Sequence, residues 1–282
     1  MTRSSFTVSC CFLALSSASQ AITSYTADFS GSAGSLTGLF RESADGAVTD
    51  AGMSWGATAG VGGGGGVLVT NTAADNFFYR PTPADNATSA FNFSALTAGQ
   101  GFSSSTDFLW SNSTSTDLTS LNIGFSTARP SNALSAAPGS SSFISGSLIR
   151  NAATTVQLRI RSDNATPFTT TFNQSVLTAG NWYRLTYQAT LNGDGTIANL
   201  VTLYSIGADG LATPVSVNSV SGAVTNTGLL AATESYSGYD IRNVNSNGID
   251  AIDNLSVTFV PEPSAMVLVA MGGVAMAARR RR

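Results

Sequence analysis

The sequence predicts an all-β fold, an antiparallel sandwich of the jelly-roll kind, and two observations carry this prediction. Apolar and polar residues alternate with period two in several stretches, whereas no ten-residue stretch of residues 22–259 shows a convincing helical period. Short clusters of Asn, Asp and Gly separate these stretches. Strands joined by such short connections are typical of a sandwich or jelly roll with one face buried and one face wet.

The clearest strand prediction is residues 182–191. Every second residue from Tyr183 to Leu191 is a tyrosine, leucine or alanine, and mostly polar residues lie between them. Residues 156–161 and 254–259 alternate in the same way. Each stretch therefore predicts a strand with its apolar face toward the core.

Turn residues connect these strands. Asn192, Gly193, Asp194 and Gly195 follow the first stretch, and the apolar run 200–206 comes next. Asn-Gly and Asp-Gly favour positive φ, so the sequence predicts a hairpin here. Asp194 also has the hard oxygens that Ca²⁺ prefers, but the acidic ladder of an EF-hand is absent, and a plain hairpin is favoured.

Residues 208–210 predict a second turn, before a strand over 211–217. The five glycines at 62–66 predict a flexible surface loop, with a strand resuming at 67–69. A phosphate-binding loop is disfavoured because neither a Lys-Ser/Thr pair nor a helix follows the glycines.

The order of these elements resembles the concanavalin A-like, laminin-G-like jelly roll. The resemblance rests on residues 180–185, the hairpin after them, and a terminal strand over 252–257. It implies one domain over 22–259 in which the final strand pairs near the first, around residues 24–29. Asp253 is expected to share the inner face with Leu255, where it caps the strand entry or, as the weaker alternative, binds Ca²⁺.

Composition excludes several chemistries. The two cysteines, Cys10 and Cys11, precede residue 22, and the chain has neither His nor Lys. Thiol, Ser-His-Asp, Schiff-base and N- or S-ligated zinc sites are thereby excluded from the body. Jelly-roll glycanases place two glutamates on one strand, whereas Glu42, Glu234 and Glu262 are far apart. We therefore predict that the protein is not an enzyme and needs no cofactor, with Ca²⁺ as the one candidate left open.

The charged and aromatic residues indicate which kinds of ligand the protein could bind. Residues 22–260 contain 8 Arg against 15 acidic residues, which argues against nucleic acid as a partner. Trp55, Trp110, Trp182 and the cluster 77–79 are candidates for stacking on sugar. Most aromatic residues of a sandwich belong to its core, so the ligand stays unknown at this stage.

The N-terminus predicts export. Arg3 precedes a short apolar stretch over residues 8–15, and Ser19 and Ala21 offer small residues for cleavage after Ala21. We expect residues 1–21 to be a signal peptide.

The C-terminus combines three signals. Pro261, Glu262 and Pro263 form an extended segment, residues 264–278 are apolar, and the chain ends in arginines. The four terminal residues are Arg279, Arg280, Arg281 and Arg282. A helix over 264–278 would span about 22 Å, less than the roughly 30 Å of a bilayer core. Clustered arginines stay on the cytoplasmic side, so the body would lie across the membrane.

This tail resembles the PEP-CTERM sorting signal of exopolysaccharide-producing Gram-negative bacteria, over residues 260–282. The resemblance implies that exosortase, a membrane protease or transpeptidase, recognises the tail. The chain would pause in the inner membrane and then reach the cell surface or a biofilm matrix, with exopolysaccharide as a possible partner. The body is expected to be structural or glycan-binding. The alternatives are a membrane-anchored surface protein with an unprocessed tail and a polysaccharide-acting jelly-roll enzyme.

Overall fold

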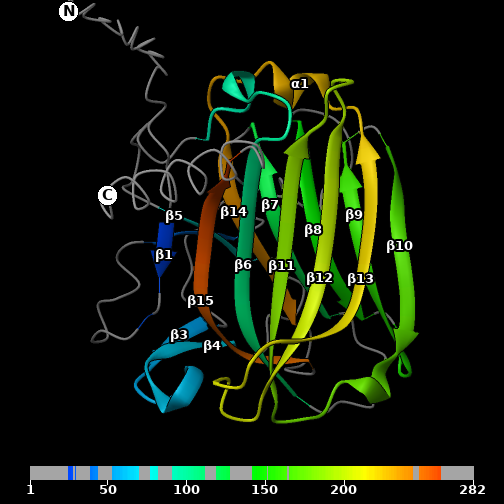
Figure 1. The fold of residues 1–282 in the computed structure, drawn as a ribbon. Coiled ribbons are helices and arrows are strands. Elements are labelled where there is room, and N and C mark those ends of the chain that lie inside the picture. The colour runs from blue at the N-terminus through cyan, green and yellow to red at the C-terminus, as the bar shows by residue number, and fades with distance from the viewer. Residues whose placement is uncertain are drawn as a thin grey trace, which may run out of the picture.

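The computed structural model describes residues 25–27, 29, 39–43, 53–69, 77–81, 91–111, 119–127, 142–150, 152–163, 165–243 and 248–261. Strands dominate this part of the chain (Figure 1). They are β1 Tyr25–Ala27, β2 Leu39–Ser43, β3 Met53–Gly56, β4 Gly66–Val69, β5 Phe77–Pro81, β6 Gly101–Trp110, β7 Thr119–Ser126, β8 Phe143–Arg150, β9 Thr155–Ser162, β10 Ala165–Asn173, β11 Trp182–Leu191, β12 Ile197–Gly207, β13 Val215–Val224, β14 Tyr236–Asn243 and β15 Ile249–Val260. The short helix α1 Thr227–Leu230 and the 3₁₀ turns Val61–Gly63, Phe93–Ala95 and Gln174–Val176 lie between them.

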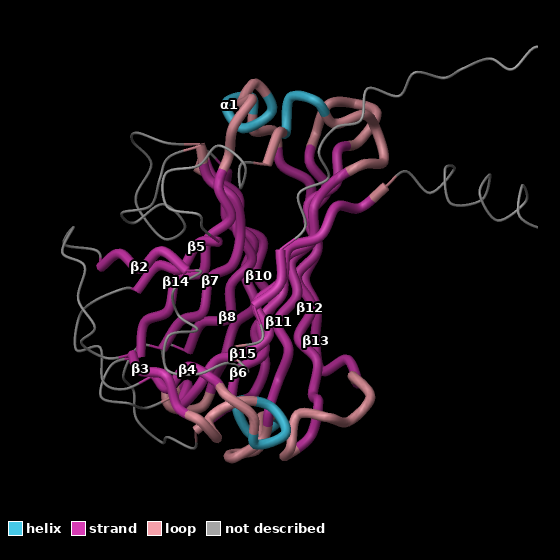
Figure 2. The backbone as a smooth tube through the Cα atoms, turned by 90° about the vertical axis from the view of Figure 1, so that its left-hand side faces the viewer, coloured by secondary structure: helices cyan, strands magenta, loops and turns pink. Residues whose placement is uncertain are grey.

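The strands form two antiparallel sheets that face each other, which confirms the predicted sandwich (Figure 2). The front sheet has the order β13-β12-β11-β6-β15-β4-β3, and β1 pairs with β15. The back sheet has the order β10-β9-β8-β7-β14-β5-β2. Several neighbours come from distant parts of the sequence, such as β6 with β11 and β15, and β14 with β7 and β5, as a jelly roll requires.

The period-two stretches are strands with the predicted faces. In β11, Tyr183, Leu185 and Tyr187 are at most 1% exposed and belong to the core between the sheets. Arg184 and Thr186 lie on the outer face and remain partly exposed. β9 and β15 contain the other two predicted stretches. Burial of the apolar half of each strand therefore holds the two sheets together.

A phenylalanine cluster closes the core next to α1. The rings of Phe91, Phe93, Phe102 and Phe125 lie 5.1 to 5.7 Å apart, in edge-to-face or tilted arrangements. Such pairs contribute about 0.5–1.5 kcal/mol each beyond their buried area. Asn226 caps α1 by accepting a hydrogen bond from the Leu229 amide at 2.9 Å.

The predicted pairing of the first and last strands is also confirmed. In β1, Tyr25 lies opposite Val257 of β15, and Ala27 lies opposite Leu255. The hairpin between β11 and β12 has the expected turn, because Gly195 has a φ of 81° and the Asn192 amide donates to the Thr196 carbonyl.

One strand begins later than the sequence predicts. The strand expected over 211–217 is β13, which starts only at Val215. The Leu211 amide donates to Asp209 Oδ1 and the Ala212 amide donates to the Ile206 carbonyl, so the turn continues past Gly210. Pro214 has no amide hydrogen to donate to a neighbouring strand, so β13 begins only after it.

The predicted signal peptide and the predicted apolar helix over 264–278 lie outside the described residues. Within the described ranges, no helix is both long and apolar enough to cross a membrane.

Candidate functional site

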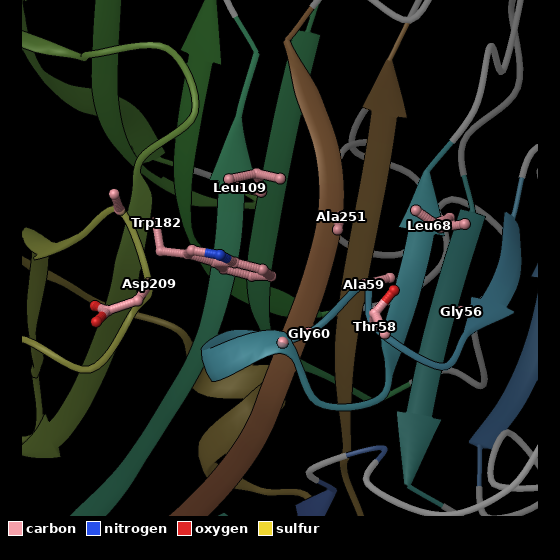
Figure 3. Close-up of a pocket in the computed structure, with 11 residues that line it drawn as sticks. Gly56, Thr58, Ala59, Gly60, Leu68, Leu109, Trp182, Asp209 and Ala251 are labelled. Carbon is pink, nitrogen blue, oxygen red and sulfur yellow. The ribbon is translucent and has the colours of Figure 1, made fainter.

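A pocket of about 420 Å³ lies on the outer face of the front sheet, near the end of β6 that carries Leu109 (Figure 3). Its size falls within the range of about 300–1,000 Å³ typical of small-ligand sites. Trp182, which is 4% exposed, is one of the residues that line it, and two loops form its walls. Figure 3 shows the Trp182 ring between Asp209 on one side and the loop that carries Gly60 on the other.

Trp182 belongs to a second apolar cluster outside the sandwich. It opens β11 on the face opposite to Tyr183, as the alternation predicts. It packs with Ile206 and Ala251, and Val61 and Leu109 pack against this cluster. Because the cluster lies on the wet side of the sheet, covering loops are needed to bury it.

The glycine-rich loop is the first wall, and backbone hydrogen bonds hold part of it. Val61–Gly63 forms a 3₁₀ turn, and the Gly60 amide donates to the Gly64 carbonyl at 2.8 Å. A Cβ on Gly60 would lie 2.0 Å from the Gly65 carbonyl oxygen. Gly60 therefore permits close backbone packing. Gly62, Gly63 and Gly64 are exposed, as predicted for a surface loop, and the flexibility of the loop stays a prediction.

Asp253 anchors this loop to the sheet. Its Oδ2 accepts a hydrogen bond from the Val61 amide at 2.9 Å, and its Oδ1 accepts one from the Asn254 amide at 2.7 Å. The expectation that Asp253 shares the inner face with Leu255 was wrong. Asn254 has a φ of 50° and sits in a β-bulge, which shifts the register of β15 against β6 between Asp253 and Ser256.

The turn after β12 is the second wall. Asp209 is exposed, and its Oδ1 accepts a hydrogen bond from the Leu211 amide at 3.0 Å. The Gly62 amide donates to the Asp209 carbonyl at 2.7 Å, so the two walls are joined directly. The pocket therefore has an exposed carboxylate at its rim, and a small part of the Trp182 side chain lines it.

A buried ion pair lies beside the pocket on the same face. Asp107 is 0% exposed and accepts two hydrogen bonds from Arg184, at 2.6 and 2.8 Å. The Asn254 Nδ2 group donates to Asp107 Oδ2 at 2.8 Å. The hydrogen bond with Asp107 raises the pKa of Arg184, although partial burial opposes this. Asp107 therefore stabilises the sheet as a fully engaged acceptor.

The other sequence-predicted aromatic residues lie elsewhere. Trp110 is a core residue with the Arg150 guanidinium 5.5 Å from its ring centre. Trp55 donates from Nε1 to the Phe29 carbonyl at 3.1 Å. Phe77–Pro81 forms β5, but the side chains of this strand are outside what the structure describes. Of the three tryptophans, Trp182 lines the pocket.

Asp194, the other candidate for Ca²⁺, lies in the hairpin turn. Its Oδ1 accepts hydrogen bonds from the Thr196 amide at 2.9 Å and from the Thr196 hydroxyl at 2.7 Å, and these bonds lower the pKa of Asp194. This is the geometry of an Asx turn. Within the described residues, no three acidic, cysteine or histidine side chains gather where they could hold a metal ion.

The sorting signal is only partly described. Pro261 follows β15 and is exposed. Ala21, Glu262, Pro263 and the four terminal arginines, Arg279 to Arg282, lie outside the described residues.

Comparison with solved structures defines the class of fold. Lectin II from Ulex europaeus has a TM-score of 0.53 and 12% identity, covering 85% of this chain and 99% of the lectin. Lectin UEA-II complexed with galactose gives a TM-score of 0.52, with the same identity and coverage. An alginate lyase from Aplysia kurodai has a TM-score of 0.49 and 10% identity, covering 85% of this chain and 99% of the lyase. The body therefore has a lectin-like, concanavalin A-like jelly-roll fold.

The C-terminus provides a more specific match. Residues 259–282 match the PEP-CTERM protein-sorting motif, one residue longer than the predicted signal. No curated protein resembles the sequence closely enough to count as a match. The chain thus carries a PEP-CTERM sorting motif after a lectin-like sandwich.

Sequence reasoning missed most of the pocket walls. The two walls are far apart in the sequence and meet through the hydrogen bond from the Gly62 amide to the Asp209 carbonyl. Beside the pocket, Asp107 and Asn254 meet only through the pairing of β6 with β15 and the bulge. The available signal was local: Asn tolerates positive φ, so the Asp253-Asn254 pair inside an alternating stretch indicates a bulge.

Proposed function

We propose that this chain is an exported protein that exosortase processes at its C-terminal motif, and that its sandwich binds glycan at the Trp182 pocket without turning it over. The match of residues 259–282 to the PEP-CTERM motif is the observation that carries the sorting part. The binding part is supported by a lining that combines apolar side chains, among them Leu68 and Leu109, with the exposed carboxylate of Asp209, which suits the apolar faces and hydroxyl groups of a sugar. A similar fold has been observed with galactose.

The position of the sorting motif in the fold sets the direction in which the pocket would face relative to the membrane. Val260 pairs with Gly101 at one end of β6, and Pro261 follows at once. Leu109 pairs with Ala251 and lines the pocket near the other end of β6. Eight residues of strand separate these positions by about 27 Å. While the tail is held in the inner membrane, the pocket would therefore point away from the membrane surface.

Processing is tested in the native host by intact-mass analysis of the mature protein. We expect a form that lacks Arg282, and retention of the whole tail when Pro261, Glu262 and Pro263 are replaced by alanine. Deletion of the exosortase gene should have the same effect. A mature wild-type protein that retains Arg282 would contradict sorting and support a simple membrane anchor.

Glycan binding is tested by pull-down of the purified full-length protein on neutral polysaccharides. Thr58 lines the pocket and is exposed, so Thr58→Arg should fill the site and abolish retention without loss of folding. Thr225→Arg is the matched control, because Thr225 is exposed near α1 at the other end of the sandwich. Equal retention of both variants would reject the pocket. Release of reducing ends would reject a non-enzymatic role.

A further inference from the structure

An apolar row crosses four neighbouring strands on the outer face of the front sheet, at the pocket (Figure 3). Trp182 of β11 pairs with Leu109 of β6. Leu109 pairs with Ala251 of β15, and Ala251 pairs with Leu68 of β4. All four residues line the pocket. The outer face of a sandwich normally carries polar side chains, so this row needs a cover from the chain or from a ligand.

The chain itself covers only part of this row. Trp182 and Ala251 are 4% and 1% exposed, and both pack in the second apolar cluster. Leu68 is 39% exposed and Leu109 is partly exposed, and Figure 3 shows these two residues on either side of Ala251. We call Leu68 and Leu109 the leucine pair. The leucine pair therefore presents apolar surface in the pocket that a ligand can reach.

The pocket has few polar side chains. Apart from Trp182, whose ring carries an N–H group, Thr58 and Asp209 are the two of its eleven described lining residues with a polar side chain, and both are exposed. None of these eleven residues is basic. A sugar hydroxyl that loses its water against a leucine gains no hydrogen bond in return, which is unfavourable. An apolar substituent of a sugar therefore fits the leucine pair better than a hydroxyl group does.

We propose that the leucine pair binds the methyl end of an acetyl group on the glycan, so that the ligand of the pocket is an acetylated polysaccharide. This inference rests on the proposed glycan-binding function and names the class of glycan. Directly paired residues lie about 5 Å apart, so the two leucines, which both pair with Ala251, are about 10 Å apart. This separation is small enough for one acetyl group to contact both leucine side chains.

A donor for the acetyl carbonyl lies in the neighbouring wall. The segment 56–59 packs beside Leu68, because a Cβ added to Gly56 would lie 3.2 Å from Leu68 Cδ1 and 2.7 Å from the Ala59 Cβ. Thr58 belongs to this segment and lines the pocket, so its hydroxyl is available to donate to the carbonyl oxygen. An anionic substituent is disfavoured, since the Asp209 carboxylate repels it and the described lining has no basic residue to attract it.

The test uses pairs of ligands that differ only in the acetyl group. Full-length protein is applied to immobilised O-acetylated xylan and to the same xylan after alkaline removal of its acetyl esters. We expect binding to the acetylated form to be about fourfold to tenfold tighter, as expected for burial of a methyl group. Titration with N-acetylchitotriose and with cellotriose forms the second pair, because an acetamide replaces one hydroxyl on each ring of the same backbone.

The two pairs separate the two linkages of the acetyl group. A preference for the acetylated member in the xylan pair alone assigns an ester-linked acetyl group. A preference in the trisaccharide pair alone assigns an amide-linked one, and a preference in both assigns the acetyl group with either linkage.

Two matched leucine variants locate the preference. Leu68→Asn keeps the approximate volume of the side chain but makes it polar, so the ratio of binding between acetylated and bare ligands should fall to about one. Leu200→Asn is the control, because Leu200 is 41% exposed on the outer face of the same sheet and is outside the pocket lining. Leu200 pairs with Gln188, six residues beyond Trp182 on β11, which is about 20 Å away. This control should keep the wild-type ratio.

The proposal is overturned if neither pair shows a preference for the acetylated member. It is also overturned if Leu68→Asn keeps the preference while its thermal unfolding matches that of wild type, or if Leu200→Asn loses it equally. Equal binding to both xylans that Thr58→Arg abolishes would reject the acetyl preference and leave the pocket as a glycan site. Absence of binding to both xylans and to every neutral polysaccharide would reject glycan binding itself.

Discussion

The outer faces of the two sheets differ in how their buried polar side chains are hydrogen-bonded. On the front sheet, Asp107 is fully buried, and Arg184 and Asn254 supply three hydrogen bonds to it. On the back sheet, Ser147 is equally buried, but its hydroxyl has no partner among the described residues. The carboxylate of Asp107 thus has its hydrogen-bond donors within the chain, whereas the buried Ser147 hydroxyl makes no hydrogen bond and is left at an energetic cost.

The bulge at Asn254 accounts for much of this difference. Its positive φ turns the side chain toward Asp107 across the strand pair, and the adjacent Asp253 holds the glycine-rich loop. Ser147 and Arg159 lie in a stretch of β8 and β9 where pairing runs without a register shift. In this stretch no bulge brings a side-chain amide toward Ser147 in the way that the bulge at Asn254 brings one to Asp107.

The largest expected effect is that of Asp107→Ala. Breaking a buried ion pair costs about 3–5 kcal/mol, and we expect the lower end because Arg184 is 35% exposed and can reach water. Urea denaturation measures the loss of unfolding free energy. Glu234→Ala, at an exposed position, is the control and should change stability by less than about 0.5 kcal/mol. Similar values for both variants would show that the front-sheet network contributes little.

Asp253→Ala should have a smaller and more local effect. Two backbone amides, those of Val61 and Asn254, lose their acceptor, and such losses cost about 1–3 kcal/mol. Hydrogen exchange at the Val61 amide should accelerate, while exchange in the β8–β9 ladder should stay as in wild type. If the Val61 amide exchanges at the wild-type rate, Asp253 does not anchor the pocket wall.

The sequence predicts the regular parts of this molecule better than its site. The β11 strand and its hairpin follow from alternation and from Asn-Gly chemistry, because both signals are local. The face of Asp253 was assigned wrongly because a single residue in a bulge reverses the alternation that the prediction uses.

The contacts of the glycine-rich loop were missed for a related reason. The Val61 amide donates to Asp253 and the Gly62 amide donates to the Asp209 carbonyl, across 192 and 147 positions of the sequence. The burial of Asn122, Ser147 and Asp240 on the outer face of the back sheet was missed because it depends on the pairing of β14, β7 and β8. Within each strand, these polar residues have the alternation of a solvent-exposed face.

The smallest expected effect is that of Ser147→Ala, and it tests the comparison most directly. An unpaired buried hydroxyl contributes no hydrogen bond, so its removal should be neutral or stabilise the protein by up to about 1 kcal/mol. Ser104→Ala is the matched variant, because Ser104 is also 0% exposed but donates to the Tyr239 hydroxyl at 3.2 Å. That variant should lose about 1 kcal/mol. Equal losses in urea denaturation would mean that Ser147 is satisfied within the chain, and the contrast between the two sheets would then disappear.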